Sequence, residues 1–258
     1  WLRDRAPIVS QDQPWFLAVN FVNPHDIMSF DYGSTSDVTM PVGLDHAVKV
    51  KPPADIPLYQ RRWDVELPST VHDDLAGAAP AVREYSDVLD VTFGAVSGED
   101  HWREGISFYL NCIRDVDRHV GVVLDALEAS GQADSTIVVF TSDHGEMAGS
   151  HGLRQKANLV YEQNFHVPLI ISHPDDRTNH GSTSSSMASA VDLVPTLLEM
   201  SGTDSATVRS SAGELPGRSL VPAMAGESVR DGVLTATESI TTLDAGFWRR
   251  FDESDALA

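Results

Sequence analysis

The sequence has little cysteine, little lysine and no long apolar runs, and each of these shortages argues against a class of bond, partner or membrane segment. Its single cysteine, Cys112, excludes an intrachain disulfide. We expect Cys112 to be a small core residue, because it falls within a helical pattern. No apolar run approaches the roughly 20 residues that cross a bilayer, so neither a membrane-spanning segment nor a signal peptide is predicted.

Positive charge is scarce as well. The 258 residues carry 38 acidic against 18 basic side chains, which gives a formal net charge of −20. This balance argues against nucleic acids and anionic membrane surfaces as partners, because both would be repelled. Only three lysines occur, Lys49, Lys51 and Lys156, so an anionic substrate would need a local positive site.

The most informative stretch that is present is residues 136–145, TIVVFTSDHG. Its apolar part, 137–140, is predicted to be a buried parallel strand, and Asp143 and His144 follow where that strand should end. Open α/β sheets present their chemistry at this end of a strand, and Gly145 would let the chain turn. Two interpretations stay open at this point. Asp143 and His144 bind a metal ion, or Asp143 caps a following helix and His144 is an ordinary loop residue.

Other segments repeat this alternation of strand and helix. The pattern predicts strands over 15–21 and 167–171 and helices over 104–129 and 192–200. Such an order indicates an α/β fold with a doubly wound, mostly parallel sheet flanked by helices. Residues 29–80 show little periodicity and are expected to form a long surface excursion, a functional lid or rim.

A loop rich in glycine separates His144 from Lys156. A loop of this composition can fold back over the strand end and place the lysine charge beside a metal site, which suits an oxyanion such as sulfate or phosphate. Taken alone, Lys156 could equally be an exposed surface lysine. His151 in the same loop is either a contact near the metal or substrate or an ordinary loop histidine.

Several blocks, taken in order, resemble the sulfatase family of the alkaline-phosphatase superfamily. They are Phe16-Leu17 with Pro24-His25, residues 143–147, His151-Gly152-Leu153 with Lys156, Tyr161-Glu162, and residues 167–171, 191–198 and 215–220. The resemblance covers most of residues 14–240 and implies an alkaline-phosphatase-like fold. Residues 1–205 would be the C-terminal part of the catalytic α/β domain, and 206–258 the start of a small α+β C-terminal subdomain.

The resemblance also implies roles for matching residues. Asp143 and His144 match two ligands of the catalytic divalent cation, expected to be Ca²⁺. A histidine ligand makes Mn²⁺, Zn²⁺ or iron more acceptable, and Mg²⁺ is a further alternative. Lys156 matches the lysine that contacts the sulfate and the bridging oxygen. His25 matches the histidine that helps the leaving group depart, and His151 would be a nearby substrate contact.

Two parts of the family pattern have no counterpart here. The nucleophile motif, Cys-x-Pro-x-Arg or Ser-x-Pro-x-Arg matured to formylglycine, is absent, and Cys112 in Asn111-Cys112-Ile113-Arg114 does not match it. The first pair of acidic metal ligands is absent too. Since the chain starts at Trp1 without an initiator methionine, we expect it to be a fragment, inactive alone, with these groups upstream.

The resemblance therefore predicts a hydrolase of small-molecule or carbohydrate sulfate esters. The closest alternative is a phosphonate monoester or phosphodiester hydrolase of the same superfamily, which would use the same residues. A third possibility, from another class, is a catalytically inactive member that binds anionic sugars or a partner protein.

Overall fold

The computed structural model of the chain describes residues 1–33, 50–156, 159–176 and 179–235. These residues form two compact units, one from 1–133 and 144–167 and the other from 134–143 and 168–237. The predicted excursion over 29–80 and the segment 206–258 lie partly outside the described residues, and the predicted boundary after residue 205 stays a prediction. In the part of the chain that is described, no helix is both long and apolar enough to cross a membrane.

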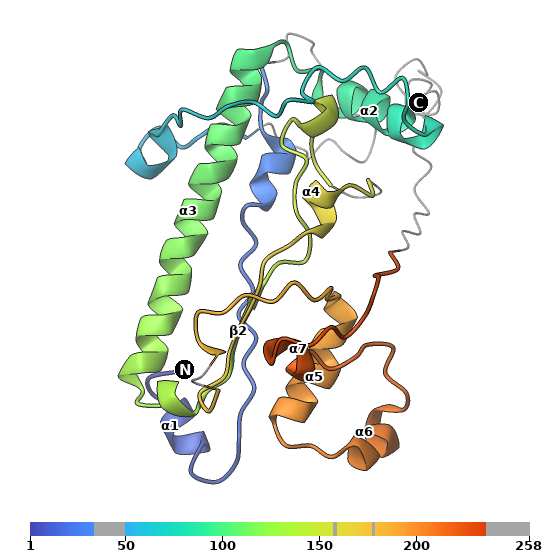
Figure 1. Ribbon diagram of the computed structural model, residues 1–258. Coiled ribbons are helices and arrows are strands. Elements are labelled where there is room, and N and C mark those ends of the chain that lie inside the picture. The colour runs from blue at the N-terminus through green and yellow to red at the C-terminus, as the bar shows by residue number, and fades with distance from the viewer. Residues whose placement is uncertain (34–49, 157–158, 177–178, 236–258) are drawn as a thin grey trace, which may run out of the picture. The chain divides into compact units, whose positions relative to one another are not determined.

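The first unit is built on one long helix, α3 (Glu99–Ala129) (Figure 1). It confirms the helix predicted over 104–129 and begins five residues earlier, after Gly98. Glu99 and Asp100 lie in its first turn, where negative charge favours the positive end of the helix dipole. The unit also contains α1 (Ala6–Val9), α2 (Pro80–Phe93), α4 (Glu162–Phe165) and the short 3₁₀ helices His25–Ser29, Pro57–Gln60 and Ser150–Gly152.

Two apolar clusters stabilise this unit. The first packs the N-terminal half of α3 against residues that precede it in the chain: Ile27, Phe30, Tyr32, Val71, Trp102, Phe108 and Cys112. Cys112 is fully buried, which confirms its predicted place in the core, and burial raises the pKa of its thiol to about 12. The second cluster joins α2 to the segment after β1: Leu75, Tyr85, Leu89, Met147, Leu153 and Leu159.

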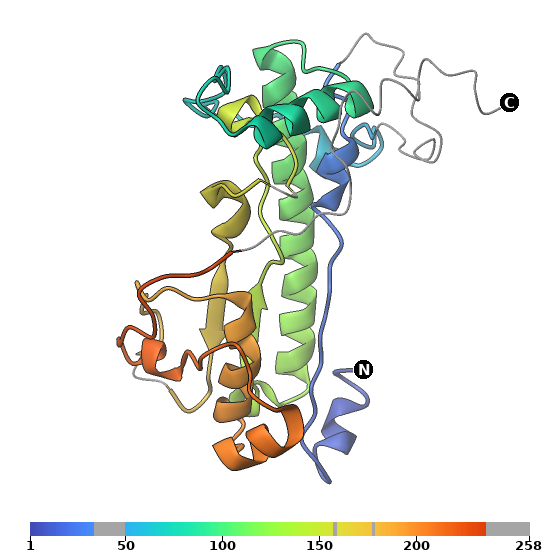
Figure 2. The ribbon, with the colours of Figure 1, turned by 90° about the vertical axis from the view of Figure 1, so that its right-hand side faces the viewer.

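The strand predicted over residues 15–21 is wrong for the described structure. The segment is extended but belongs to no β-ladder, and it runs alongside α3 (Figures 1 and 2). Phe21 stacks on His119 of α3, and the Trp15 indole donates to Gln132. A strand needs a hydrogen-bonded neighbour, and no described segment pairs with this one. Its apolar side chains are consequently exposed, Phe16 to 79%.

The second unit holds the two strands. β1 (Val138–Thr141) and β2 (Leu169–Ser172) lie within one or two residues of their predicted positions. They pair antiparallel with each other, whereas the strand over 137–140 was expected to have a parallel neighbour. Thr141 at the end of β1 pairs with Leu169 at the start of β2. The residues between the two strands thus leave and re-enter the sheet at the same end, as they do between neighbouring antiparallel strands.

Burial of these strands also differs from the prediction. Phe140 is 42% exposed and Ile170 61% exposed, because no described layer covers them on both faces. The other regular elements described in the unit are helical: the 3₁₀ turn Ala190–Asp192, α5 (Leu193–Met200), α6 (Ser205–Ala212) and α7 (Val221–Met224). α5 confirms the helix predicted over 192–200.

Candidate active site

The end of β1 carries Asp143 and His144, as the sequence predicted. No helix begins after Asp143, since residues 144–147 have no regular secondary structure, so the alternative in which Asp143 caps a helix is wrong. The Asp143 side chain is exposed and accepts a hydrogen bond from Ser142 Oγ at 3.4 Å. The boundary between the two units passes between Asp143 and His144.

The half-buried imidazole of His144 is held by its own chain. Its Nδ1 lies 2.9 Å from the carbonyl oxygen of Gly145. A carbonyl oxygen only accepts, so Nδ1 carries the proton and Nε2 holds the lone pair in the neutral ring. Backbone carbonyls orient many metal-binding histidines in this way, and His144 is thus in the tautomer that a metal ligand at Nε2 requires.

Gly145 is needed for a close approach rather than for a left-handed turn. A Cβ atom at this position would lie 1.9 Å from the carbonyl oxygen of Gln163. The two segments pair there, since Gly145 N–H donates to Asn164 O at 2.8 Å and Glu146 N–H donates to Gln163 O at 3.1 Å. The glycine was expected to relieve the backbone after the strand, and the structure shows that it makes room for α4 instead.

The loop from 146 to 156 folds back on itself. That it folds over the strand end, as its composition suggests, stays a prediction. Met147 N–H donates to Gln155 O at 3.0 Å, and Gly149 N–H donates to Leu153 O at 2.8 Å. Met147 and Leu153 are almost fully buried in the second apolar cluster, which anchors the loop in the core. Lys156 therefore follows directly on Gln155, which is hydrogen-bonded to the start of the same loop.

The backbone of this loop is strained. Ala148, His151 and Gln155 have φ values of 45°, 56° and 67°, in the left-handed region that non-glycine residues rarely adopt. Each such residue costs on the order of 1–3 kcal/mol and persists only where surrounding contacts impose it. Strain of this kind concentrates at functional sites, which adds a reason to place the site here.

Glu146 is the residue that the sequence interpretation missed. Its side chain is buried, and Oε1 accepts the backbone N–H groups of Gln155 and, at 3.4 Å, Ala148. Burial raises the pKa of this carboxyl group; the two N–H donors and then the charges of Lys156 and His144 act in the opposite direction. Lys156 and His144 thus both lie within electrostatic reach of Glu146. In the sequence, only its position in the block Asp-His-Gly-Glu indicated that Glu146 belongs to this region.

His25 reaches the same region through a short 3₁₀ helix. A cis peptide bond joins Asn23 to Pro24, and His25 begins the helix His25–Ser29 with its side chain exposed. The buried side chain of Ile27 fixes this helix in the first apolar cluster. Gln155 Nε2 donates to Met28 O at 3.1 Å, which joins the helix that carries His25 to the residue before Lys156.

His151 has structural contacts that the sequence did not predict. Its Nδ1 lies 2.9 Å from Asp73 Oδ2, its ring stacks on Tyr161 with 4.7 Å between centroids, and its N–H donates to Thr70 Oγ1. The hydrogen bond from His151 is the largest cause that lowers the pKa of Asp73. The side chain thus joins three segments of the first unit, and its predicted substrate contact stays a prediction.

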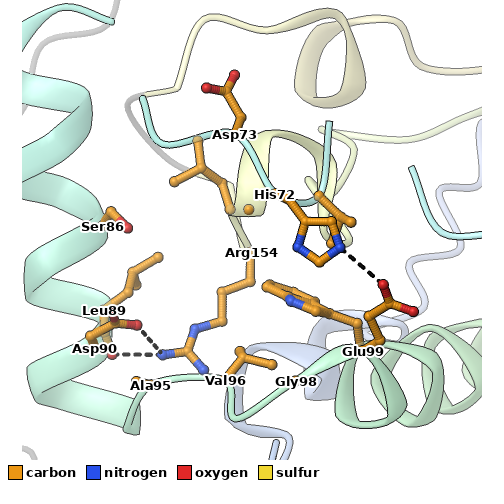
Figure 3. Close-up of a pocket in the computed structure, with 14 residues that line it drawn as sticks. His72, Asp73, Ser86, Leu89, Asp90, Ala95, Val96, Gly98, Glu99 and Arg154 are labelled. Atoms are coloured by element: carbon orange, nitrogen blue, oxygen red, sulfur yellow. Dashed lines mark hydrogen bonds and ion pairs between the residues drawn. The ribbon is translucent and has the colours of Figure 1, made fainter. Parts of the chain in front are cut away.

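A cavity of about 310 Å³ lies beside this loop (Figure 3). Arg154 extends along its wall and is 3% exposed. Its Nη2 donates to Leu89 O at 2.9 Å and to Gly94 O at 2.6 Å, and it lies 3.4 Å from Asp90 Oδ1. These bonds use carbonyl oxygens at the C-terminal end of α2, where the helix dipole is negative and favours a cation. They also attach the loop to that helix.

Asp143 and His144 remain predicted metal ligands. Within residues 1–33, 50–156, 159–176 and 179–235, no group of three or more His, Cys, Asp or Glu side chains is placed to hold a metal ion. The donor types of Asp143 and His144 and the tautomer of His144 fit a divalent cation, but two ligands are too few for the six to eight that Ca²⁺ takes.

Comparison with known proteins decides the family. The family model described as Sulfatase matches residues 4–203. The chain belongs to the sulfatase family. This family lies in the alkaline-phosphatase superfamily, as the sequence blocks predicted.

Individual sulfatases and related hydrolases are similar to this chain. It is 37% identical over 164 residues to an N-acetylglucosamine-6-O-sulfatase from Bacteroides thetaiotaomicron, covering 62% of the chain and 27% of that protein. The solved structure of a 2-O GAG sulfatase aligns with a TM-score of 0.64 and 22% identity, covering 89% of this chain and 46% of the other. The phosphonate monoester hydrolase of Silicibacter pomeroyi aligns with a TM-score of 0.55 and 27% identity, covering 72% and 38%.

These alignments confirm the α/β class and the alkaline-phosphatase-like fold that the sequence predicted. The sulfatase chain spans less than half the length of each of these proteins. The antiparallel pairing of β1 and β2 is therefore a local feature of a fold assigned to α/β as a whole.

Proposed function

We propose that the whole protein hydrolyses sulfate esters, with a small-molecule or carbohydrate ester as substrate. Membership of the sulfatase family supports this, and the similar N-acetylglucosamine-6-O-sulfatase points to a sugar ester. The observation that carries the proposal is the folded loop, which brings Lys156 into electrostatic reach of Glu146 beside His144 and, through Gln155, next to the helix of His25.

In this proposal Asp143 and His144 are two ligands of a divalent cation, Ca²⁺ first, with Mn²⁺, Mg²⁺ and Zn²⁺ as alternatives. Asp143 contributes a carboxylate oxygen and His144 its Nε2. The remaining ligands, and a formylglycine nucleophile made from Cys or Ser, come from residues outside this sequence. The bound cation supplies positive charge that offsets the charge building on the transferred group.

Lys156 and His25 carry the other two roles. The Lys156 ammonium group binds the sulfate oxygens and the bridging oxygen, where a fixed positive charge stabilises the transition state more than the ground state. As the bond between sulfur and the bridging oxygen breaks, an imidazolium form of His25 donates its proton to that oxygen. This proton transfer matters most for alkoxide leaving groups, which are poor without it.

A hydrolase of phosphonate monoesters is the second candidate. It is favoured by the likeness to the Silicibacter pomeroyi enzyme at 27% identity. The whole protein assayed on an aryl sulfate and on the matching aryl phosphonate separates the two. We expect a higher kcat/KM on the sulfate, and a preference for the phosphonate by orders of magnitude would contradict the sulfatase proposal. Turnover of neither ester would favour the inactive, anion-binding alternative.

The division of roles is tested by two substitutions in the whole protein. We expect Asp143→Ala to abolish activity and to lower the metal content measured by elemental analysis. Lys156→Ala should lower kcat by about 100-fold or more while the metal content stays near that of the parent. Lys51→Ala, at a lysine whose side chain is 77% exposed, is the matched control and should leave both values unchanged. Equal metal loss in the Asp143 and Lys156 variants would contradict the division.

A further inference from the structure

We propose that Glu146 and Gln155 are positioning residues that fix Lys156 and the helix of His25 in one geometry. The inference rests on the proposed function for its catalytic meaning, but the contacts themselves are independent of it. They form a continuous path, from the Glu146 carboxylate to the Gln155 backbone and from the Gln155 side chain to Met28 O.

The first part of this path is the buried carboxylate. Glu146 is 8% exposed, yet its Oε2 atom has no hydrogen-bond partner among the residues that the structure describes, while Oε1 accepts the N–H groups of Gln155 and Ala148. Burying a carboxylate costs several kcal/mol, and an apolar residue of the same size would fill the space more cheaply. An apolar residue would, however, provide no acceptor for the N–H group of Gln155, the residue directly before Lys156.

The second part is the Gln155 side chain. Gln155 is buried, has a φ of 67°, and places its Nε2 3.1 Å from Met28 O in the middle of the helix that begins at His25. The left-handed backbone at Gln155 is imposed by the contacts on both sides of it, since glutamine has no intrinsic preference for that region. The cost of this conformation is offset by a bond that joins two segments 127 residues apart.

Lys156 is thereby held on both sides. Its carbonyl oxygen accepts a hydrogen bond from Tyr85 Oη at 2.8 Å, and the residue before it is held by Glu146. Tyr85 itself lies in the second apolar cluster, so this end of the loop is attached to α2. The backbone of Lys156 is thus fixed relative to the His25 helix.

Fixed backbones matter here because the two proposed groups act on the same ester bond. Displacing a catalytic group by about 1 Å can lower the rate by about 100-fold without touching the substrate. Removing the bond from Gln155 to Met28 should therefore disturb His25 more than Lys156. Removing the Glu146 acceptor should disturb both.

The first test substitutes Gln155→Met in the whole protein, which keeps the length of the side chain and removes its donors. We expect kcat to fall by about 10-fold on an aryl ester with a good leaving group and by about 100-fold on an alkyl ester, with KM changed less than threefold. Gln132→Met, at the opposite end of α3, also removes side-chain hydrogen bonds and should leave kcat unchanged. Equal loss on both esters would overturn the assignment of Gln155 to His25.

The second test compares Glu146→Ala with Glu146→Gln. The amide oxygen of glutamine can still accept the Gln155 N–H, so Glu146→Gln should keep kcat within about threefold of the parent. Glu146→Ala should lower kcat on both esters by a similar factor, about 100-fold. If Glu146→Gln loses as much as Glu146→Ala, the acceptor role is overturned. If Glu146→Ala does not fold, the glutamine variant decides the question alone.

Hydrogen exchange separates failure of this inference from failure of the proposed function. It needs no turnover, and it is measured on the same variants by mass spectrometry. Gln155→Met should speed exchange in the peptide around residues 25–31, and Glu146→Ala in that and in the peptide around 147–156, with Gln132→Met unchanged in both. Unchanged exchange in these peptides overturns the positioning link whether or not the parent hydrolyses any ester. If the parent has no activity but exchange is faster in the two variants than in the parent, the positioning link is supported and only the proposed function is contradicted.

Discussion

Gly145 offers a sharp test of how the strand end is built, because the structure assigns it a steric role. In Gly145→Ala the new Cβ would lie 1.9 Å from Gln163 O, whereas such contacts essentially never fall below 3.0 Å. The two paired segments must therefore part by about 1 Å. Both backbone bonds at this site, of 2.8 and 3.1 Å, would then exceed hydrogen-bond length.

The expected cost follows from these two bonds and the steric shift. Each lost backbone hydrogen bond costs about 0.5–1.5 kcal/mol, and forcing extra volume into a packed site adds about 1–3 kcal/mol. Part of each cost is recovered as the segments relax, so we expect Gly145→Ala to lower the free energy of unfolding by about 2–4 kcal/mol. For a protein of this size that corresponds to a fall in Tm of roughly 5–15 °C.

Gly121→Ala is the matched control. Gly121 lies within α3, and a Cβ there meets nothing within 4 Å. An alanine in a helix interior is about 0.5–1 kcal/mol more favourable than glycine, so this variant should be as stable as the parent or more so. Thermal and urea unfolding of the three proteins are compared. A Gly145→Ala variant within about 0.5 kcal/mol of the parent would refute the close approach on which the reasoning depends.

Two further predictions concern stability. Asp192 is fully buried, accepts the N–H groups of Ser189 and Arg218, and pairs with Arg230. Asp192→Ala should lower the free energy of unfolding in urea by about 3–5 kcal/mol, because it leaves the largely buried guanidinium of Arg230 without its carboxylate partner. The exposed control Asp231→Ala should change this free energy by less than about 0.5 kcal/mol. A loss below about 1 kcal/mol for Asp192→Ala would contradict the pairing. The pKa of Asp73 is lowered by His151, so its ionised form stabilises the fold above pH 3.8 and this contribution is lost as the pH falls below that value. Asp73→Asn should therefore be less stable than the parent at pH 6, and this difference should shrink as the pH falls below 3.8. A difference independent of pH would be evidence against the pair.

The helices could be predicted from local patterns because their periodicity is intrinsic to the chain. α3 has apolar residues at helical spacing and Gly131 after its end, and two of the three predicted strands fall within two residues of β1 and β2. What failed was pairing. The segment 15–21 has the composition of a strand, but a strand exists only with a neighbour, and local composition carries no information about neighbours.

The residues of the candidate site came in part from the sequence, and their roles stay predictions. Asp143, His144, Lys156 and His25 came from motif blocks, and the glycines of the loop indicated that it can fold back. Glu146 and Gln155 were missed because their importance comes from burial and from partners distant along the chain. A charged or amide residue in a loop is ordinarily exposed, and nothing in the sequence indicates that Gln155 reaches Met28.

The sequence by itself determined the family, the helices and the residue types that could bind a cation and an oxyanion, because those depend on local pattern and on ordered motifs. Only the tertiary structure decided that Gly145 makes room for Gln163, that β1 and β2 run antiparallel, and that Glu146 and Gln155 connect Lys156 to the helix of His25. The physical reason is the same in each case. Steric approach, strand pairing and buried hydrogen bonds are relations between distant segments, and they come into existence only when the chain has folded.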